Sequence, residues 1–357
     1  MILVTGGGTG GHLYPGLATA RALRELGQAV TYVGAEGGLE EKVLPTSGLP
    51  YRLIPAGKLS REALRPKEGL KVLHGLWEAR KVLRELKPKA VLSTVGYAGF
   101  PLAFMAQRMG IPTVIHEQNA QLGLAARWLA GGASAIGLSV PIELNAPWSA
   151  KAQVVGLPVR EEKHDARAAK IALGLEPEKP LIFVLGGSQG SLELNQNLPE
   201  RLKPLLGEYQ VLHQSGPRWE TQMQAQYATW PGYTVRGYLD TALAFSAAEF
   251  AITRAGAATL AEAAYHRVPL LAVPLPAEMD GGAQWANARF YADIGAAYML
   301  ERGWEHFQTS IAPLLEPSVR QKLRDTIAQL SPAGAAYRLA RMVLEASFQG
   351  NGREVTG

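Results

Sequence analysis

Two glycine-rich segments carry the residue types that bind phosphate. Each follows a short apolar run and precedes a helical segment: Gly-Gly-Gly-Thr-Gly-Gly-His at residues 6–12 and Gly-Gly-Ser-Gln-Gly at residues 186–190. Glycines let the backbone approach an anion closely, and a helix N-terminus adds unpaired N–H groups and the positive end of a dipole. The pattern therefore predicts one phosphate loop at the start of each half, as in a protein that closes over a diphosphate between two domains.

The first loop also satisfies the dinucleotide fingerprint G-x-G-x-x-G, through Gly6, Gly8 and Gly11. That fingerprint requires an acidic residue at the end of the second strand. Here the second strand is expected to end at Gly34, and the nearest acid, Glu36, lies beyond it. A nicotinamide enzyme and a purely structural glycine turn are therefore the less favoured interpretations.

The distribution of aspartate bears on metal use. Asp occurs only at positions 165, 240, 280, 293 and 325, so the sequence contains no Asp-x-Asp pair to clamp a metal-bound nucleotide diphosphate. Charge on a departing diphosphate would then be met by helix dipoles, N–H groups, hydroxyls and arginine. We therefore expect no metal and no cofactor.

These loops are embedded in an alternation of β-rich apolar runs and helical segments. The expected strands are residues 2–5, 30–33, 90–94, 113–116 and 135–138, and then 181–185, 210–213, 233–235, 250–253 and 270–273. Such alternation is typical of right-handed βαβ units on a parallel sheet. Two series in one chain predict an α/β protein with two Rossmann-like, doubly wound domains facing a cleft, joined near residues 154–165.

Composition narrows the class of protein further. A chain of 357 residues without cysteine excludes a disulfide framework, Cys-ligated zinc, an iron–sulfur cluster and a thiol nucleophile. Residues 1–157 hold 17 Lys and Arg against 10 Glu and no Asp, whereas the remainder holds 19 basic against 21 acidic residues. The basic first half indicates an anionic partner or simply a solvated surface. No apolar run is long enough for a membrane span, and the N-terminus has the character of a buried strand rather than a secretion signal.

Seven motifs together resemble a bacterial family, the UDP-N-acetylglucosamine:N-acetylmuramyl-(pentapeptide) pyrophosphoryl-undecaprenol N-acetylglucosamine transferases, which form lipid II. The resemblance spans nearly the whole chain. Its motifs, in order, are GGGTGGHLYP at 6–15, HEQN at 116–119, GLPVR at 156–160, GGSQGSLELNQ at 186–196, HQSG at 213–216, RAGAATLAE at 254–262 and QWANA at 284–288.

The resemblance implies a GT-B fold and an inverting glycosyl transfer. N-acetylglucosamine would pass from UDP-N-acetylglucosamine to the muramyl 4-hydroxyl of lipid I, for peptidoglycan synthesis and thus cell-wall biogenesis, cell shape and cell division. The implied domains are residues 1–157 plus 335–357, which face the acceptor and the membrane, and residues 158–334, which bind the UDP-sugar. The implied location is the cytoplasmic face of the plasma membrane, peripherally bound, with no nucleic-acid partner.

The resemblance assigns most donor contacts to the second half. Arg160 and Ser188 would meet the UDP diphosphate, and Leu239 would present backbone groups to uracil. Glu262 would take the ribose hydroxyls, because a carboxylate accepts both at once. The turn and helix start beneath the nucleotide would be formed by Ala257, Ala258, Thr259, Leu260, Ala261 and Glu262.

The remaining contacts lie on the sugar side of the donor. Asn119 would hold a sugar hydroxyl, and Gln284, with Asn287, would read the N-acetylglucosamine hydroxyls. The first loop would lie near the donor sugar and the acceptor diphosphate, through Thr9, Gly10 and Gly11.

Other interpretations of these residues remain open. Glu262 also fits a first-turn helix acid, Arg160 a linker ion pair, Asn119 a turn residue and Glu117 a solvated loop acid. The sequence departs from the family's pattern in three places: Val95 and Phe100 stand where the family usually has glycine, Ala255 replaces a serine, and Asp-Gly-Gly-Ala-Gln at 280–284 replaces the usual Asp-His-Gln before the final amide. An isomerase of the same fold, UDP-N-acetylglucosamine 2-epimerase, is the main alternative function, and a sugar-nucleotide sensor without turnover is a weaker one.

The acceptor hydroxyl needs a base, and His12 is the first candidate. It stands at the mouth of the first loop, and an unperturbed imidazole titrates near pH 6.5. Contact with a phosphate, without proton transfer, is an equally weighted role, and a purely structural helix cap is a third.

Residues 67–87 form an amphipathic segment with a second apolar stripe. At about 100° per residue, Val72, Leu76, Ala79, Leu83 and Leu86 share the face expected to pack on the sheet. The opposite face is expected to be exposed to water and to contact an anionic membrane surface. This second stripe and its cationic flank consist of Leu70, Leu73, Trp77, Arg80, Lys81 and Arg84.

Overall fold

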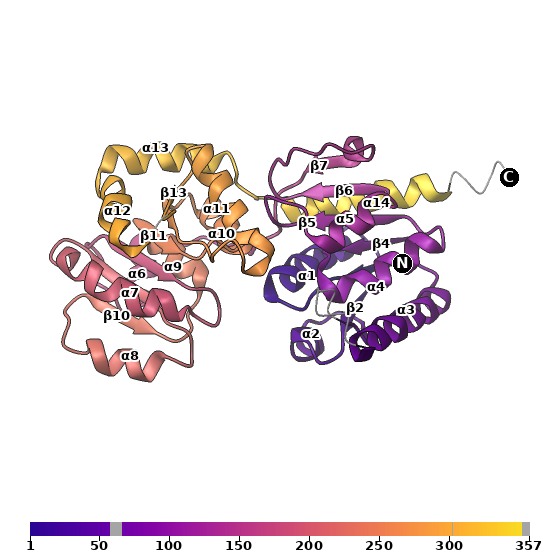
Figure 1. Ribbon diagram of the computed structural model, residues 1–357, viewed down its shortest axis with the longest axis horizontal. Helices are drawn as coiled ribbons and strands as arrows, with labels where there is room; N and C mark the ends of the chain where they lie inside the picture. The colour runs from indigo at the N-terminus through magenta and orange to yellow at the C-terminus, as the bar shows by residue number, and fades with distance from the viewer. Residues whose placement is uncertain (58–65, 302, 352–357) are drawn as a thin grey trace. The chain divides into compact units, whose positions relative to one another are not determined.

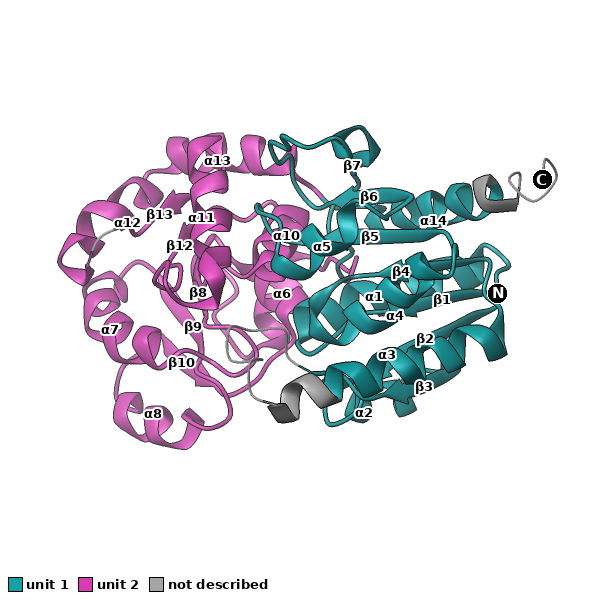
Figure 2. Ribbon diagram, turned by 45° about the vertical axis from the view of Figure 1, so that its right-hand side comes forward, with its two compact units in different colours: residues 1–159, 332–357 teal, residues 160–331 magenta. Residues whose placement is uncertain are grey.

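The computed structural model describes residues 1–57, 66–301 and 303–351, with the side chains of residues 66–70 and 349–351 left out. The chain divides into two compact units, Met1–Val159 with Pro332–Gly357 and Arg160–Ser331 (Figure 2). These boundaries lie two and three residues from the expected ones. Each unit is an α/β layer structure (Figure 1).

Unit 1 is built on a seven-stranded sheet with the strand order β3-β2-β1-β4-β5-β6-β7, in which every pairing is parallel. Its strands are β1 (Ile2–Thr5), β2 (Val30–Ala35), β3 (Tyr51–Ile54), β4 (Ala90–Ser93), β5 (Thr113–Glu117), β6 (Ala135–Leu138) and β7 (Ala152–Val154). Its helices are α1 (Gly10–Glu25), α2 (Leu39–Val43), α3 (Pro66–Leu86), α4 (Gly96–Arg108), α5 (Leu124–Ala130) and α14 (Ala335–Asn351).

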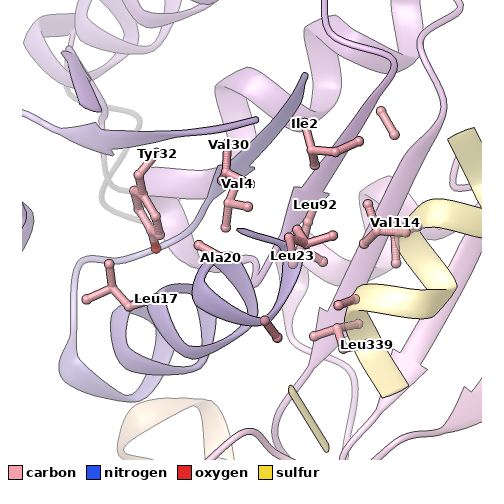
Figure 3. Packing of buried hydrophobic residues seen from close by; sticks show 14 of the residues in the cluster. Ile2, Val4, Leu17, Ala20, Leu23, Val30, Tyr32, Leu92, Val114 and Leu339 are labelled. Atoms are coloured by element: carbon pink, nitrogen blue, oxygen red, sulfur yellow. The ribbon is translucent and has the colours of Figure 1, made fainter. Parts of the chain in front are cut away.

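Alternate side chains of the unit 1 strands enter two separate cores. Ile2 and Val4 point to the face covered by α1 and α14, whereas Leu3 points to the face covered by α3 and α4. Figure 3 shows Leu23 of α1 and Leu339 of α14 packed against this first face. Burial on both faces explains why these strands are almost continuously apolar.

Unit 2 repeats the plan with a six-stranded parallel sheet of order β10-β9-β8-β11-β12-β13. Its strands are β8 (Leu181–Leu185), β9 (Gln210–Gln214), β10 (Tyr233–Arg236), β11 (Phe250–Thr253), β12 (Leu270–Ala272) and β13 (Tyr298–Met299). Its helices are α6 (Ala166–Ala172), α7 (Leu192–Leu202), α8 (Glu220–Tyr227), α9 (Thr241–Ala247), α10 (Ala257–His266), α11 (Ala283–Asp293), α12 (Phe307–Leu315) and α13 (Pro317–Ala328).

Both strand orders reverse direction beside the first strand of each unit. In unit 1 the reversal lies between β1 and β4, and in unit 2 between β8 and β11. In open parallel sheets, ligands bind at the carboxyl ends of the strands at such a switch point. The two glycine loops follow β1 and β8, so the topology places each of them at its unit's switch point. The expected α/β class with two doubly wound units is therefore confirmed.

Candidate functional site

The first glycine loop is covered by protein side chains over its first three residues. Gly6 and Gly7 are buried, and Gly8 donates its N–H to the Glu40 carboxylate at 2.7 Å. The exposed part begins at Thr9, where α1 starts. The N–H groups of the first helical residues have no partner within a helix, so Gly10 and Gly11 are the positions at which this loop can meet an anion.

His12 is half-buried next to the exposed Thr9, with its Nδ1 atom 2.9 Å from Thr9 Oγ1. Burial lowers the pKa of His12 to about 4, so the ring is neutral at pH 7. If Nδ1 carries the proton, Nε2 is free to accept one. If the Thr9 hydroxyl donates to Nδ1, Nε2–H is a donor suited to a phosphate oxygen. Both roles expected of His12 thus remain open, and the Thr9 hydrogen bond selects between them.

The segment after β5 forms the neighbouring wall. A Cβ on Gly11 would lie 3.4 Å from Gln118 Oε1, so this segment adjoins the first loop. The Glu117 carboxylate accepts from the backbone N–H groups of Gln118, Asn119 and Gly123 and from the Asn119 side-chain amide, at 2.9–3.1 Å. The interpretation of Glu117 as a solvated loop acid was wrong, because the side chain is 1% exposed and serves as the anchor of this loop.

Asn119 is held with its amide nitrogen on Glu117, which leaves the residue half-buried beside the first loop. Val95, two residues after the end of β4, adopts φ +54° at a position where the resembled family usually has glycine. The next residue, Gly96, packs on the imidazole, since a Cβ there would lie 3.3 Å from His12 Cγ. His12 and Asn119 are therefore fixed by loops that follow three adjacent strands.

The second glycine loop is open at its tip and packed at its ends, where a Cβ on Gly186 or Gly190 would overlap the backbone of Ser191 or Ser215. Ser188 and Gln189 are exposed, and a Cβ on Gly187 would meet nothing within 4 Å. The loop closes with a hydrogen bond from Gly190 N–H to Gly187 O at 2.9 Å. Ser191 caps α7 by accepting the N–H of Leu194. Ser188 thus stands at the exposed tip of this loop.

The buried Arg254, at the end of β11, braces the second loop from the side. Its guanidinium donates to Ser191 Oγ at 3.1 Å, to the carbonyls of Val273 and Pro274 at 3.2 Å, and to the Glu193 carboxylate. Arg254 therefore ties together the ends of three neighbouring strands, β8, β11 and β12.

Arg160 and Glu262 lie in one electrostatic cluster of unit 2. Arg160 donates to Asp240 Oδ2 at 2.9 Å and to Glu162 Oε2 at 2.7 Å. Burial raises the pKa of Glu262 to about 7, and the charge on Asp240 adds to this rise, whereas Thr241 and Arg160 oppose it. The linker ion pair of Arg160 is thus present, and the charge on Arg160 also acts on Glu262, the acid expected to bind ribose.

The other expected donor residues also lie in unit 2, and one of them contacts the turn before α10. Asn287 is buried and donates its side-chain amide to Ala255 O at 3.0 Å, which joins α11 to that turn. Gln284 Oε1 accepts from Leu275 N–H at 3.3 Å. Leu239 is buried next to the capping residue Asp240. The helix start is formed by Ala257, Ala258, Thr259, Leu260, Ala261 and Glu262.

The outer face of α3 is exposed as expected. Leu73 and Trp77 are 65% and 60% exposed, and Lys81 Nζ lies 5.6 Å from the centre of the Trp77 ring. Arg80 and Arg84 are also exposed. The side chain of Leu70 lies outside the described residues. Sequence reasoning missed an exposed pair on α5, Leu124 and Trp128, because that helix is too short to show a second stripe.

Within the described parts of the chain, no helix is long and apolar enough to cross a membrane. Among the same residues, no three histidine or acidic side chains gather closely enough to hold a metal ion.

Comparison with known proteins gives the same two units. Residues 2–137 match the glycosyltransferase family 28 N-terminal domain, and residues 181–330 match the glycosyltransferase family 28 C-terminal domain. A Thermus thermophilus protein named UDP-N-acetylglucosamine--N-acetylmuramyl-(pentapeptide) pyrophosphoryl-undecaprenol N-acetylglucosamine transferase is 53% identical, covering 96% of this chain and 99% of that protein. A Deinococcus deserti protein of the same name is 38% identical over 96% of this chain and 98% of its own length.

Solved structures agree with these relatives. The crystal structure of Acinetobacter baumannii MurG superposes with a TM-score of 0.79 at 29% identity, covering 96% of this chain and 99% of that one. A Streptomyces glycosyltransferase, SsfS6 complexed with thymidine diphosphate, shares the fold with a TM-score of 0.67 at 16% identity, covering 96% and 99% of the two chains. With family domains matched in both units, the chain belongs to glycosyltransferase family 28.

Proposed function

We propose that this protein transfers N-acetylglucosamine from UDP-N-acetylglucosamine to the muramyl 4-hydroxyl of lipid I, with inversion at the anomeric carbon, giving lipid II. The observation that carries the proposal is the cluster of Arg160, Asp240 and Glu262 in unit 2, which provides a cation for a diphosphate next to a carboxylate for a ribose. The names of the Thermus and Deinococcus relatives, which match nearly the whole chain, support the choice of substrates.

On the donor side, Arg160 must exchange partners when the diphosphate binds. Its guanidinium is now shared between Asp240 and Glu162, but it is 55% exposed and free to rotate toward an incoming phosphate. Ser188 at the open tip of the second loop would contribute a hydroxyl and backbone N–H groups. Leu239 and Glu262 would fix uracil and ribose, so the leaving group is held at both ends. Gln284 and Asn287 would read the sugar hydroxyls.

On the acceptor side, the muramyl hydroxyl attacks the anomeric carbon from the face opposite UDP. The transition state of glycosyl transfer resembles an oxocarbenium ion. Positive charge at the sugar is then balanced by the departing diphosphate, which the second loop and Arg160 stabilise. His12, neutral at pH 7, either takes the acceptor proton at Nε2 or donates Nε2–H to the acceptor diphosphate. Thr9, Gly10, Gly11 and Asn119 would position the reacting sugars.

The test is a transfer assay with labelled UDP-N-acetylglucosamine and a lipid I analogue, with and without a chelator. We expect labelled lipid II in both conditions. Labelled UDP-N-acetylmannosamine formed from the donor alone would instead identify a 2-epimerase. Donor binding without any product would identify a sensor, and loss of transfer with chelator would overturn the metal-independent mechanism.

We also propose that α3 brings unit 1 to the cytoplasmic leaflet, where a polyprenyl-anchored acceptor resides. The support is the exposure of Leu73 and Trp77 together with the cations Arg80, Lys81 and Arg84 on the same exposed side of α3. Exposed apolar and aromatic groups flanked by cations suit an anionic interface.

Vesicle sedimentation tests the membrane contact. The double substitution Leu73→Ser with Trp77→Ser should reduce sedimentation with anionic vesicles at low salt, and salt should weaken the binding of the unmodified protein. A matched control replaces the exposed Ile171 of unit 2, which is 55% exposed, by Ser. Unchanged sedimentation and unchanged salt sensitivity of the double variant would refute the contact.

A further inference from the structure

A buried carboxylate lies directly beneath the first glycine loop. Glu40, in the first turn of α2, is 0% exposed. Its Oε1 atom accepts the Gly8 N–H at 2.7 Å, whereas its Oε2 atom is buried without a hydrogen-bond partner among the described residues. Burying a carboxylate with part of its bonding capacity unmet costs free energy. A residue kept at such a cost needs an explanation.

Three glycines from two segments make room for this side chain. A Cβ on Gly7 or on Gly38 would overlap the Glu40 carboxylate. A Cβ on Gly34 would lie 2.8 Å from Glu40 Cβ, closer than real side chains approach. The glycines around Glu40 therefore serve to seat a protein carboxylate at the place where a phosphate loop would seat a ligand.

Side chains also pack closely against Gly6 and Gly8, the other two residues of the covered part of the loop. A Cβ on Gly6 would overlap the Thr94 hydroxyl, and a Cβ on Gly8 would overlap the Tyr97 ring. Tyr32 donates its hydroxyl to Gly6 O at 2.7 Å. Residues 6–8 thus have protein on each of these sides, and the Gly8 N–H already has an acceptor in Glu40.

We propose that Glu40 is a positioning residue for the transfer reaction: its carboxylate occupies the Gly8 N–H, fixes the first loop, and so confines substrate-anion binding to Gly10, Gly11 and His12 at the start of α1. This inference rests on the proposed function, because the anion in question is the diphosphate of the acceptor. Glu40 touches no substrate and acts through the loop that does.

Three variants separate the hydrogen bond from the charge. Glu40→Gln keeps an acceptor for Gly8 N–H but removes the charge. Glu40→Asp keeps the charge but draws the oxygen away from Gly8 by about one bond length. The matched control is Glu41→Gln, which removes a charge from the adjacent, exposed residue, whose carboxylate accepts from Gly37 N–H at 3.2 Å.

Turnover and UDP affinity are measured for each variant with UDP-N-acetylglucosamine and a lipid I analogue. A small misplacement of catalytic groups costs on the order of tenfold to 100-fold. We expect Glu40→Asp to lose at least about tenfold in kcat, and Glu40→Gln and Glu41→Gln to stay within about threefold, with UDP affinity unchanged throughout. Equal losses in Glu40→Gln and Glu40→Asp, or wild-type turnover in Glu40→Asp, would overturn the proposal.

Amide hydrogen exchange over residues 6–12 provides a readout that does not depend on activity. Exchange at the Gly8 amide should be faster in Glu40→Asp than in the unmodified protein and should be slow again in Glu40→Gln. If the unmodified protein transfers no sugar, the proposed function fails, and this exchange pattern alone then decides the role of Glu40 in the loop. Equal exchange rates in the three proteins would overturn that role.

Discussion

The two glycine loops follow equivalent strands of two similar sheets, yet buried charges of opposite sign hold them. A carboxylate holds the first, since Glu40 accepts the Gly8 N–H. A guanidinium holds the second, since Arg254 donates to Ser191 Oγ, to Glu193 and to two carbonyls. A carboxylate accepts hydrogen bonds and so occupies N–H donors of the loop, whereas a guanidinium donates and occupies only acceptors.

This difference decides what each loop offers a ligand. The second loop keeps its backbone donors around the exposed Ser188 and Gln189, which suits a diphosphate. The first loop offers donors only from Thr9 onward, at the start of α1. Glycines pack the backbone against the protein in both loops, but the second loop leaves its tip open, whereas the first is open only from Thr9 onward.

His12→Ala should produce the largest effect, because it removes the side chain at the one open end of the first loop. We expect turnover to fall by about 100-fold or more with UDP affinity unchanged, the range for loss of an acid–base group. Steady-state kinetics with a lipid I analogue, together with UDP titration, would show this. Near-normal turnover would remove His12 from the chemistry.

Arg254→Met breaks the second loop's brace. It leaves two buried carbonyls and the Ser191 hydroxyl without their donor, so the free energy of unfolding should fall by about 2–3 kcal/mol. UDP affinity should fall as well, because the loop loses its fixed position. Chemical denaturation and calorimetric titration would measure the two effects.

Arg320→Met is the matched control for Arg254→Met. Arg320 is equally buried in unit 2 and donates to Glu249 and to Leu314 O, both at 2.8 Å, but it does not contact the loop. Arg320→Met should reduce the free energy of unfolding about as much as Arg254→Met does, and it should leave the UDP affinity of the folded protein unchanged. If both variants lost UDP affinity equally, the brace would have no specific role at the loop.

Glu262→Ala sharpens the assignment of the donor pocket. The substitution should weaken UDP binding by about 1–3 kcal/mol, the scale for leaving buried polar partners unpaired. Glu178→Ala, at an acid that is 82% exposed in the same unit, is the control and should bind normally. Equal UDP affinity of Glu262→Ala and the unmodified protein would refute ribose binding by this carboxylate.

The pH dependence of donor binding should be smaller but specific. Burial raises the pKa of Glu262 to about 7, so the free protein loses the carboxylate form as the pH falls below that value. If ribose binding requires the carboxylate, affinity for UDP-N-acetylglucosamine should fall about tenfold from pH 8 to pH 6, because a protonated carboxyl accepts less well. In Glu262→Gln this dependence should disappear, and its persistence there would assign it to another group.

The repeating architecture was predictable because its signals are local. Strands such as Leu181–Leu185 and Phe250–Thr253 coincide with the apolar runs that predicted them, since strands buried on both faces are apolar throughout. The inward and outward faces of α3 were also predictable, because helical periodicity is a local signal. The strands that were missed, Tyr51–Ile54, Ala152–Val154 and Tyr298–Met299, are short segments in the outer parts of the sheets.

The residues that hold the loops were not predictable in the same way. Glu40 has the sequence signature of a first-turn helix acid, and its contact with Gly8 joins residues 32 positions apart. Arg254 reaches Ser191 across 63 positions. Such contacts depend on which strands are neighbours, and the hydropathy pattern does not encode strand order. Gly7 was therefore attributed to phosphate binding, whereas it makes room, together with Gly34 and Gly38, for the Glu40 carboxylate.

The most direct test of different roles for the two loops is calorimetric. UDP affinity is measured for Glu40→Asp, for Arg160→Ala and for the unmodified protein under the same conditions. We expect unchanged affinity for Glu40→Asp. For Arg160→Ala we expect a loss of about tenfold or more, the scale of a hydrogen bond to a charged group. Weakened UDP binding by Glu40→Asp, or normal binding by Arg160→Ala, would contradict different roles for the two loops.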